Sequence, residues 1–328
     1  MITRRQVLKG AAALGLAGFA TGGYAFAIEP NRLAVTRYKL TPPQWRNGPD
    51  VRIVAIADLH TCKPWMTADR VGSIARRVNA LKPDVVVLLG DYTASHRFIT
   101  GAVPHDDWAA ALSDLSAPLG VFAILGNHDW WERFEWQRTR RGPTLSGEAL
   151  RRAGIPVLEN TSVQLAKDKR AFWLSGLGDQ WAFWLTEQRQ RHRGNSGTRF
   201  MPDGTFGFEG RDDLPTTLST LKDDAPAILL AHEPDIFPQV PARYALTMSG
   251  HTHGGQVQFM GWAPKVPSIY GSRYVYGRVT EADDKGVDRD LIVSCGLGCS
   301  GLPIRFGRPP ELTVVDIASP SGQKAARS

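Results

Sequence analysis

Six short apolar runs, each followed at once by small or polar residues, most constrain what this chain can fold into. They are VRIVAIADLH (51–60), DVVVLLGDYT (84–93), GVFAILGNHD (120–129), AFWLSGLGD (171–179), AILLAHEPD (227–235) and YALTMSGHTH (244–253). Each run is rich in β-branched residues and continuously apolar for about four to eight residues, which is typical of a buried strand. The sequence therefore predicts six buried strands with polar residues at their ends.

Helical patterns separate some of these strands. TADRVGSIARRVNAL (67–81) precedes the second strand, DDWAAALSDLS (106–116) precedes the third, and SGEALRRAG (146–154) follows it. Alternation of strands and helices predicts a layered α/β fold. Residues 270–298 alternate more between apolar and polar and predict a hairpin, and ELTVVDI (311–317) predicts one more strand.

The remaining sequence predicts one domain. No internal repeat and no low-complexity linker interrupts residues 28–328, so we expect these residues to form a single unit. The stretch 185–213 is rich in Arg, Gly and Asn and is expected to be a surface excursion. The small and polar residues from about 318 to 328 are expected to form a flexible tail.

Residues 1–27 have the features of an export signal. A charged start with Arg4, Arg5 and Lys9 leads into an apolar run that ends in Ala25-Phe26-Ala27. The paired arginines resemble the twin-arginine signal, the address of proteins exported after folding. Five glycines between Gly10 and Gly23 make the run weakly hydrophobic and broken, which disfavours a spanning helix.

We therefore expect a periplasmic or otherwise extracytoplasmic protein that uses the twin-arginine export machinery. The alternative is a short membrane anchor that stays in place. The sequence does not decide whether the segment is cut, nor whether the exported protein also contacts a membrane peripherally.

The charge of the chain argues against a nucleic-acid partner. The formal net charge is +7, but residues 1–27 hold three of the positive charges, which leaves +4 on the other 301 residues. The sequence also contains no RNA-binding motif, no recognition-helix pattern and no basic stripe interleaved with aromatic residues.

The three cysteines, Cys62, Cys295 and Cys299, predict no metal site of their own. Their number is odd and none of their spacings is CxxC, so a thiolate metal site is not expected. An exported protein could oxidise Cys295 with Cys299, but buried free thiols are the simpler prediction.

Polar side chains able to bind metal ions gather where the predicted strands end. They are Asp58, His60, Asp91, Asn127, His128, Asp129, His232, His251 and His253, and they include five of the eight histidines. Open α/β sheets build their sites at the carboxyl ends of strands, and neutral imidazole is the commonest protein metal ligand. The pattern predicts a metal site at these strand ends.

The order D-x-H, G-D, G-N-H-D, H and G-H-x-H resembles that of the calcineurin-like metallophosphoesterases, and all five blocks occur in order between residues 58 and 253. SGHTHGGQV, LAHEPDIF and GLPIRFGRPPE resemble the branch that holds bacterial exported phosphodiesterases and UDP-2,3-diacylglucosamine pyrophosphatase-like enzymes. The resemblance covers nearly all of the mature chain. It implies a layered β-sandwich flanked by helices, with the metal site at the C-terminal ends of strands.

The resemblance also implies the ligands of two divalent transition-metal ions. Asp58, His60, Asp91 and His253 would hold one ion, and Asp91, Asn127, His232 and His251 would hold the other. A bridging carboxylate suits two cations about 3.5–4 Å apart, because it cancels part of their repulsion. Nitrogen and oxygen ligands without thiolate fit Mn, Fe or Zn.

The activity that the resemblance implies is metal-dependent hydrolysis of phosphoric esters. A metal-bridged hydroxide would attack a phosphodiester or pyrophosphate bond in a small-molecule or lipid-linked substrate. His128 is implied to contact the phosphate and assist the leaving group, with Asp129 orienting it, although Asp129 could instead form a salt bridge or a turn cap. The alternatives are a catalytically silent metal-binding scaffold on the same fold and a phosphoprotein phosphatase; the mild charge disfavours a nuclease.

Other residues receive weaker predictions. Arg305 is expected either to clamp a phosphate or to form a surface salt bridge, and Cys62 to be a packed thiol. The remaining histidines, expected to be solvated, are His96, His105 and His192.

The tryptophans near two strand ends could pack a helix onto the core or form a wall beside the metals for an apolar substrate group. Trp131 and Trp184 are the candidates for such a wall. Trp130 and Phe134 are four residues apart, so they are expected to share one face of a helix.

The export signal gives a first testable prediction. Replacing both Arg4 and Arg5 by Lys is expected to leave the protein in the cytoplasm, because the twin-arginine route requires the pair. Cell fractionation with an antibody to the folded domain measures the distribution. Unimpaired export of the double-lysine variant would contradict the twin-arginine assignment.

Overall fold

The computed structural model describes residues 3–185, 198–200 and 207–320. The α-helices in this part of the chain are α1 (Arg4–Gly23), α2 (Ala68–Ala80), α3 (His105–Ser113), α4 (Asn127–Trp131), α5 (Phe134–Thr139), α6 (Leu145–Arg152) and α8 (Leu214–Ser219). Shorter helical turns are η1 (Tyr24–Ile28), η2 (Glu29–Asn31), η3 (Pro43–Trp45), η4 (Pro234–Gln239), η5 (His253–Gly255) and η6 (Gly271–Tyr274).

The strands form two large mixed sheets and one small sheet. The first sheet has the order β1 (Ala34–Leu40), β14 (Glu311–Ile317), β2 (Val51–Ile56), β3 (Val85–Leu88) and β4 (Val121–Ala123). The second has the order β12 (Gly277–Ala282), β13 (Asp288–Val293), β11 (Tyr244–Ser249), β10 (Ala227–Leu230), β6 (Arg170–Gly176) and β5 (Thr161–Lys167). The small sheet has the order β7 (Phe183–Trp184), β9 (Gly207–Glu209) and β8 (Thr198–Phe200).

The strands that carry the predicted site run parallel within each large sheet. β2, β3 and β4 are parallel neighbours in the first sheet, and β6, β10, β11 and β13 are parallel neighbours in the second. Parallel neighbours bring their carboxyl ends to the same edge of a sheet. Polar residues that follow different strands can therefore meet at that edge.

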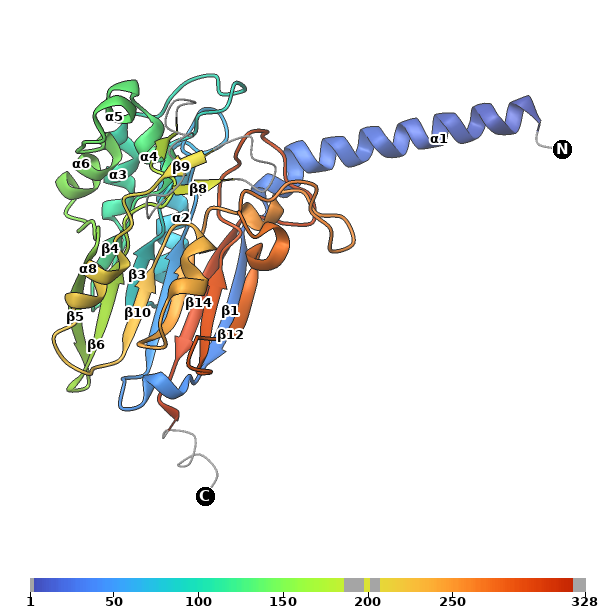
Figure 1. The fold of residues 1–328 in the computed structure, drawn as a ribbon. Coiled ribbons are helices and arrows are strands. Elements are labelled where there is room, and N and C mark those ends of the chain that lie inside the picture. Colours follow the sequence, from blue (N-terminus) through green and yellow to red (C-terminus); the bar gives the residue numbers. More distant parts are fainter. Residues whose placement is uncertain (1–2, 186–197, 201–206, 321–328) are drawn as a thin grey trace.

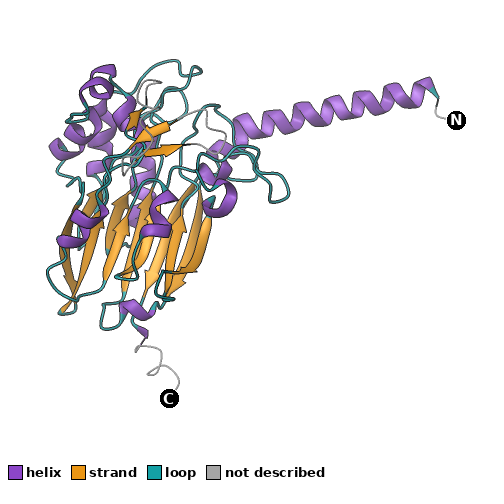
Figure 2. Ribbon diagram, viewed as in Figure 1, coloured by secondary structure: helices purple, strands orange, loops and turns teal. Residues whose placement is uncertain are grey.

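The space between the two large sheets is filled by apolar side chains. Ile53 and Val87 of the first sheet belong to the same buried cluster as Phe172, Ile228 and Met248 of the second. Successive residues of a strand point to opposite faces of its sheet, so every second residue of β2 and β3 contributes to this cluster. The two sheets form a sandwich, whose strands are drawn in orange in Figure 2.

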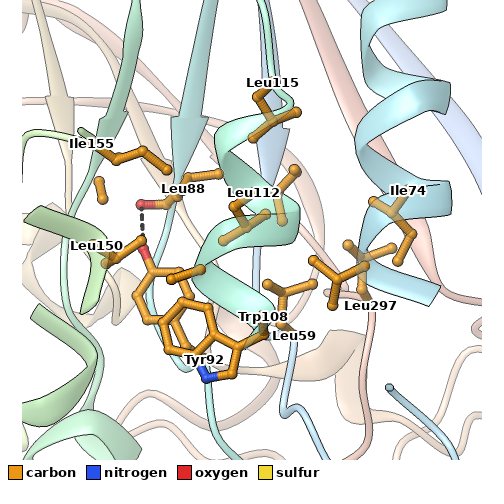
Figure 3. Close-up of a cluster of buried hydrophobic side chains, with 14 of the residues drawn as sticks. Leu59, Ile74, Leu88, Tyr92, Trp108, Leu112, Leu115, Leu150, Ile155 and Leu297 are labelled. Atoms are coloured by element: carbon orange, nitrogen blue, oxygen red, sulfur yellow. Dashed lines mark hydrogen bonds between the residues drawn. The ribbon is translucent and has the colours of Figure 1, made fainter. Parts of the chain in front are cut away.

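Helices cover the outer face of the first sheet. Val54 and Leu88 point outward and pack with Ile74 of α2, Trp108 of α3 and Leu150 of α6. Figure 3 shows this cluster, in which the rings of Tyr92 and Trp108 stack with their centroids 5.1 Å apart. Because both faces of β2 and β3 are buried, their sequences are continuously apolar rather than alternating.

The second sheet is also covered on its outer face. Leu229 and Leu291 pack there with Ile236 and Phe237 of η4. The predicted layered α/β sandwich flanked by helices is confirmed. The predicted hairpin is also confirmed, as the antiparallel pair β12 and β13.

Some predicted boundaries differ from the structure. Strand β5 was not predicted, and the expected surface excursion 185–213 contains β8 and β9, while its other central residues lie outside the described part. Ala318 donates its backbone N–H to the carbonyl oxygen of Leu40, so the expected tail is still attached at its first residue. Residues 321–328 lie outside the described part.

The N-terminal apolar run forms one continuous helix that leaves the body of the protein (Figure 1). Its five glycines do not break it, and no residue of α1 is buried. Residues Arg4–Asn31 are long and apolar enough to cross a membrane, a test that a signal sequence also passes. The expectation that the five glycines would break the run and disfavour a spanning helix is therefore wrong for the helix itself.

Candidate metal centre

The nine predicted site residues come together at one end of the sandwich. Asp58 and His60 follow β2, Asp91 follows β3, and Asn127 starts α4 directly after β4. His232 follows β10 in the other sheet, and the His251–His253 loop follows β11. The carboxyl ends of strands from both sheets therefore supply one site.

Five of these residues have a left-handed backbone. The φ angles are 51° at Asp58, 46° at His60, 58° at Asp91, 68° at His251 and 52° at His253. Non-glycine residues rarely adopt this region, and each instance costs about 1–3 kcal/mol unless the surroundings enforce it. Strained turns of this kind gather at functional sites, because they aim side chains that a relaxed loop would not.

Asp91 is the centre of the arrangement. Its Oδ2 lies 3.5 Å from Nε2 of His60 and 3.3 Å from Nε2 of His232. The Nδ1 of His60 lies 3.1 Å from the carbonyl oxygen of Thr93, and the Nδ1 of His232 lies 2.6 Å from that of Leu89.

These contacts fix the protonation of both rings. A carbonyl oxygen only accepts, so Nδ1 carries the proton in each ring and Nε2 of a neutral ring is a bare acceptor. A carboxylate oxygen that faces two acceptors is stable only if positive charge lies among them. Carbonyl oxygens that orient the rings of metal-binding histidines are the usual outer partners of such sites.

The second group of close contacts joins His253 to His60 and Asp58. The Nε2 atoms of His60 and His253 are 3.1 Å apart, and Nε2 of His253 lies 3.8 Å from Oδ1 of Asp58. Two nitrogen ligands bound about 2.1 Å from one metal ion lie about 3.0–3.4 Å from each other. The geometry of Asp58, His60 and His253 therefore fits one bound cation.

The third group brings Asn127 to His251. The Oδ1 of Asn127 lies 3.0 Å from Nδ1 of His251. Among the described residues, Nε2 of His251 is buried and has no hydrogen-bond partner. The possible ligand atoms of Asp91, His232 and His251 all lie within 4.8 Å of one another. Asp91, His232 and His251 therefore form a second group of possible metal ligands.

The pKa shifts show the same need for positive charge. Burial raises the pKa of Asp58 to about 7 and lowers that of His60 to about 3. Burial alone would also lower the pKa of His232, but Asp91 raises it well above its usual value. Burial lowers the pKa of His251 and His253 well below the usual value, which keeps these rings neutral as metal ligands must be.

His128 differs from the other site histidines in its exposure. It is half-buried, whereas the seven predicted metal ligands are all buried. Its Nδ1 lies 2.9 Å from Oγ of Ser95, and its ring meets that of His60 edge to face with the centroids 4.7 Å apart. His128 therefore lies on the accessible side of the candidate ligands. Burial lowers its pKa below the usual value.

Asp129 binds backbone rather than the ring of His128. Its Oδ2 accepts from the N–H groups of Asp91 at 3.1 Å and Gly126 at 2.9 Å, and its Oδ1 accepts from that of Tyr92 at 3.1 Å. It thereby caps α4 and ties the loop after β3 to the loop after β4. Asp129 was expected to orient His128, but among the described residues Nδ1 of His128 has Ser95 as its partner instead.

Ser95 was missed by the sequence reasoning. Nothing in the segment GDYTAS marks this serine, because its role depends on the loop after β3 folding beside α4. The carbonyl groups of Thr93 and Leu89 were missed for the same reason.

Three weaker predictions are wrong. Arg305 neither clamps a phosphate site nor forms a surface salt bridge: its side chain is fully buried and donates to the carbonyl oxygens of Gly298, Cys295 and Arg308. His96 is buried rather than solvated.

His105 is also not merely solvated, since it starts α3 and its Nε2 lies 2.7 Å from Glu132. His192 lies outside the described residues. The three cysteines are free, and Cys62 and Cys295 are buried.

The tryptophans divide between the core and the site. Trp130 and Phe134 do not share a helix face, because α4 ends before α5 begins; Trp130 is buried and Phe134 is 84% exposed. Trp131 contacts the ring of His128 with the centroids 5.1 Å apart and that of Trp184 at 4.3 Å. Trp181 meets the ring of His251 at 4.6 Å.

The sequence of this chain is similar to a known protein family and to several curated proteins. A model of the calcineurin-like phosphoesterase family matches residues 51–255, a range that contains all nine predicted site residues. An uncharacterized metallophosphoesterase of Aquifex aeolicus is 28% identical over 302 residues, which cover 90% of this chain and 95% of that protein.

Two further relatives have named activities. The phosphodiesterase YaeI of Escherichia coli is 28% identical, covering 97% of this chain and 100% of that protein. The UDP-2,3-diacylglucosamine pyrophosphatase LpxG of Chlamydia trachomatis is 26% identical, covering 89% of this chain and 91% of that protein.

The three backbone contacts of Asp129 generate a second testable prediction. In Asp129→Asn an amide NH₂ would face a backbone N–H that now donates to the carboxylate. We expect the free energy of unfolding to fall by about 1–3 kcal/mol, measured by urea denaturation, and metal retention to weaken because the loop after β3 moves. Asp288→Asn, at an exposed position, is the control. Unchanged stability and metal content in Asp129→Asn would contradict the positioning role.

Proposed function

The chain belongs to the calcineurin-like phosphoesterase family and is a metal-dependent phosphoric ester hydrolase, and from this premise we propose that it uses a dinuclear centre to hydrolyse phosphodiester or pyrophosphate bonds. Asp58, His60, Asp91 and His253 would hold one ion, and Asp91, Asn127, His232 and His251 the other. The nitrogen and oxygen donors fit Mn, Fe or Zn.

The position of Asp91 carries this proposal. Its Oδ2 lies between the Nε2 atoms of His60 and His232, at 3.5 Å and 3.3 Å, and each imidazole belongs to a different candidate ligand group. A single carboxylate oxygen that faces both groups is the expected geometry of a bridging ligand. The retention of every predicted ligand, together with His128, speaks against a silent scaffold.

The chemistry that two bound ions supply is a lowered pKa of a bound water and polarised phosphoryl oxygens. The chain itself must then hold the phosphate and protonate the leaving group. We assign both tasks to His128, because its ring lies on the accessible side and its Nδ1 lies 2.9 Å from Oγ of Ser95. The negative charge of a bound phosphoester favours the imidazolium form of His128, which burial alone disfavours.

Aromatic rings beside His128 support a substrate with an apolar or aromatic group. Trp131 and Trp184 are in contact, Trp131 is half-buried, and Trp184 is 37% exposed. Rings that are partly wet favour amphipathic ligands. The similarity to a diacylglucosamine pyrophosphatase points the same way, so we propose a lipid-linked phosphoester as the substrate class.

The dinuclear centre is tested by Asp91→Asn. The variant loses the bridging charge, so we expect it to bind fewer than the two ions of the parent and to lose most activity. Elemental analysis of the purified variant gives the metal content, and a soluble aryl phosphodiester gives the activity. Two bound ions and full activity in Asp91→Asn would refute the shared-ligand arrangement.

The acid role is tested by His128→Ala. The metal content is expected to stay at the parent value, while kcat falls by roughly 10²–10⁴-fold for substrates with poor leaving groups. Activated aryl esters need little protonation and should lose much less. Equal losses on alkyl and aryl esters would contradict proton donation by His128, and Ser95→Ala should reproduce a smaller version of the same pattern.

The aromatic wall is tested by Trp131→Ala and Trp184→Ala. Each is expected to raise KM for a lipid phosphodiester by about 2- to 10-fold, since aromatic contacts contribute about 0.5–1.5 kcal/mol, and to leave small soluble diesters nearly unaffected. Phe134→Ala, at a nearby exposed position, is the control. Equal effects on both substrate types would return these rings to a packing role.

A further inference from the structure

The segment after α1 is part of the folded body. Ala25 is buried, and its carbonyl oxygen accepts from the backbone N–H of Arg305 at 2.9 Å. Arg70 donates to the carbonyl oxygen of Pro30 at 2.5 Å. The ring of Phe26 meets that of Trp65 with the centroids 6.0 Å apart. The junction of α1 with the body is therefore held from two sides.

Two loops, 256–267 and 300–306, contact each other and the junction. The ring of Tyr24 contacts that of Phe306 with the centroids 6.4 Å apart, and Phe306 pairs with Val257 through backbone contacts. Gln256 donates to the carbonyl oxygens of Ser300 and Leu302 at 3.1 Å and 2.9 Å. The loops 256–267 and 300–306 therefore form one surface next to the end of α1.

Large apolar side chains project from these two loops. Phe259 is 63% exposed, Met260 is 92% exposed, Trp262 is 67% exposed and Leu302 is 47% exposed. We call these four residues the apolar tip. Backbone hydrogen bonds of 2.9 Å in both directions between Phe259 and Trp262 close the turn, so the tip is held out by backbone structure. Exposed large apolar groups that gather in this way mark an interaction surface.

The loops around the tip carry positive charge and no acidic residue. Residues 254–276 and 294–310 contain no Asp or Glu. Arg305 is fully buried and Arg273 pairs with Glu281 at 2.9 Å, so Lys265 supplies the positive charge nearest the tip. Lys265 is exposed. Tryptophan and basic residues beside apolar groups are typical of protein segments at the surface of a lipid bilayer.

We propose that the apolar tip enters the interface of a phospholipid bilayer, the same bilayer that α1 is long and apolar enough to cross. Figure 1 shows α1 leaving the body on the side where loops in orange project. The helix and the tip would then hold one face of the protein against the membrane.

This orientation has a consequence for the candidate metal centre, which rests on the proposed function. A cavity of about 330 Å³ lies beside the tip loops, and its lining includes one candidate metal ligand, His253, together with Val257, Lys265 and Leu302. With the tip in the interface, a phosphate in a lipid headgroup could reach His253 through this cavity without the lipid leaving the bilayer.

The experiment places a fluorescent probe at the tip of the full chain. Met260→Cys is labelled in a Cys299→Ser background, and the protein is reconstituted in vesicles of phosphatidylcholine and phosphatidylglycerol that contain brominated lipids. The control is Val287→Cys, 42% exposed in the turn between β12 and β13. We expect a blue shift and loss of fluorescence for the probe at 260 and neither for the probe at 287.

The result is independent of catalysis, since the assay needs no metal and no substrate. Weaker quenching in a Lys265→Glu variant would support contact with anionic headgroups. A probe at 260 that is no more quenched than the probe at 287 would overturn the proposal and leave the proposed hydrolase activity untouched. Quenching at 260 in a protein with no phosphoesterase activity would support the membrane surface alone.

Discussion

The carboxylate of Asp91 holds together loops from both sheets. Its Oδ1 accepts from the backbone N–H of His128 at 2.9 Å, and its Oδ2 faces His60 and His232. Its own backbone N–H donates to Asp129. The loops after β2, β3, β4 and β10 thus converge on one buried side chain. A buried carboxylate costs free energy unless positive charge lies beside it, and an imidazolium at His232 or a bound cation can supply that charge.

The sheets provide the rigidity that this site needs. The five left-handed residues of the candidate centre lie directly after strands whose both faces are packed. Close packing also leaves no room for larger residues: a Cβ on Gly126 would lie 2.4 Å from Oδ1 of Asp91, and one on Gly250 would lie 2.6 Å from Oδ2 of Asp58. The glycines of the sequence blocks G-N-H-D and G-H-x-H are therefore needed because carboxylates occupy the space beside them.

The sequence was sufficient to predict the elements with strong local signals. The buried strands β2, β3, β4, β6, β10 and β11 and the helices α2, α3 and α6 all fall within predicted ranges or within a residue or so of them. Strand β5 was not foreseen because its residues are mostly half-exposed and their pattern is weak. The burial of Arg305 and the contact of Ser95 with His128 depend on loops far apart in sequence, which local patterns do not encode. The separate helices α4 and α5 also escaped prediction, since a spacing of four residues does not reveal the break between them.

The rings of His128, His60 and His253 form a row, and a different surface lies at each end of it. The two surfaces suggest how many organic groups the substrate carries on its phosphorus. The ring of His60 meets that of His128 edge to face, with the centroids 4.7 Å apart. It also stacks on the ring of His253, with the centroids 4.9 Å apart. At one end, His128 contacts Trp131, which in turn contacts Trp184. At the other end, His253 lines the cavity beside the apolar tip. A phosphomonoester carries one organic group and would use only one of these surfaces. A phosphodiester or a pyrophosphate carries a group on each side of the bond that breaks, and it can use both. Under the proposed function, the contacts of the site thus favour a substrate with two arms over a monoester.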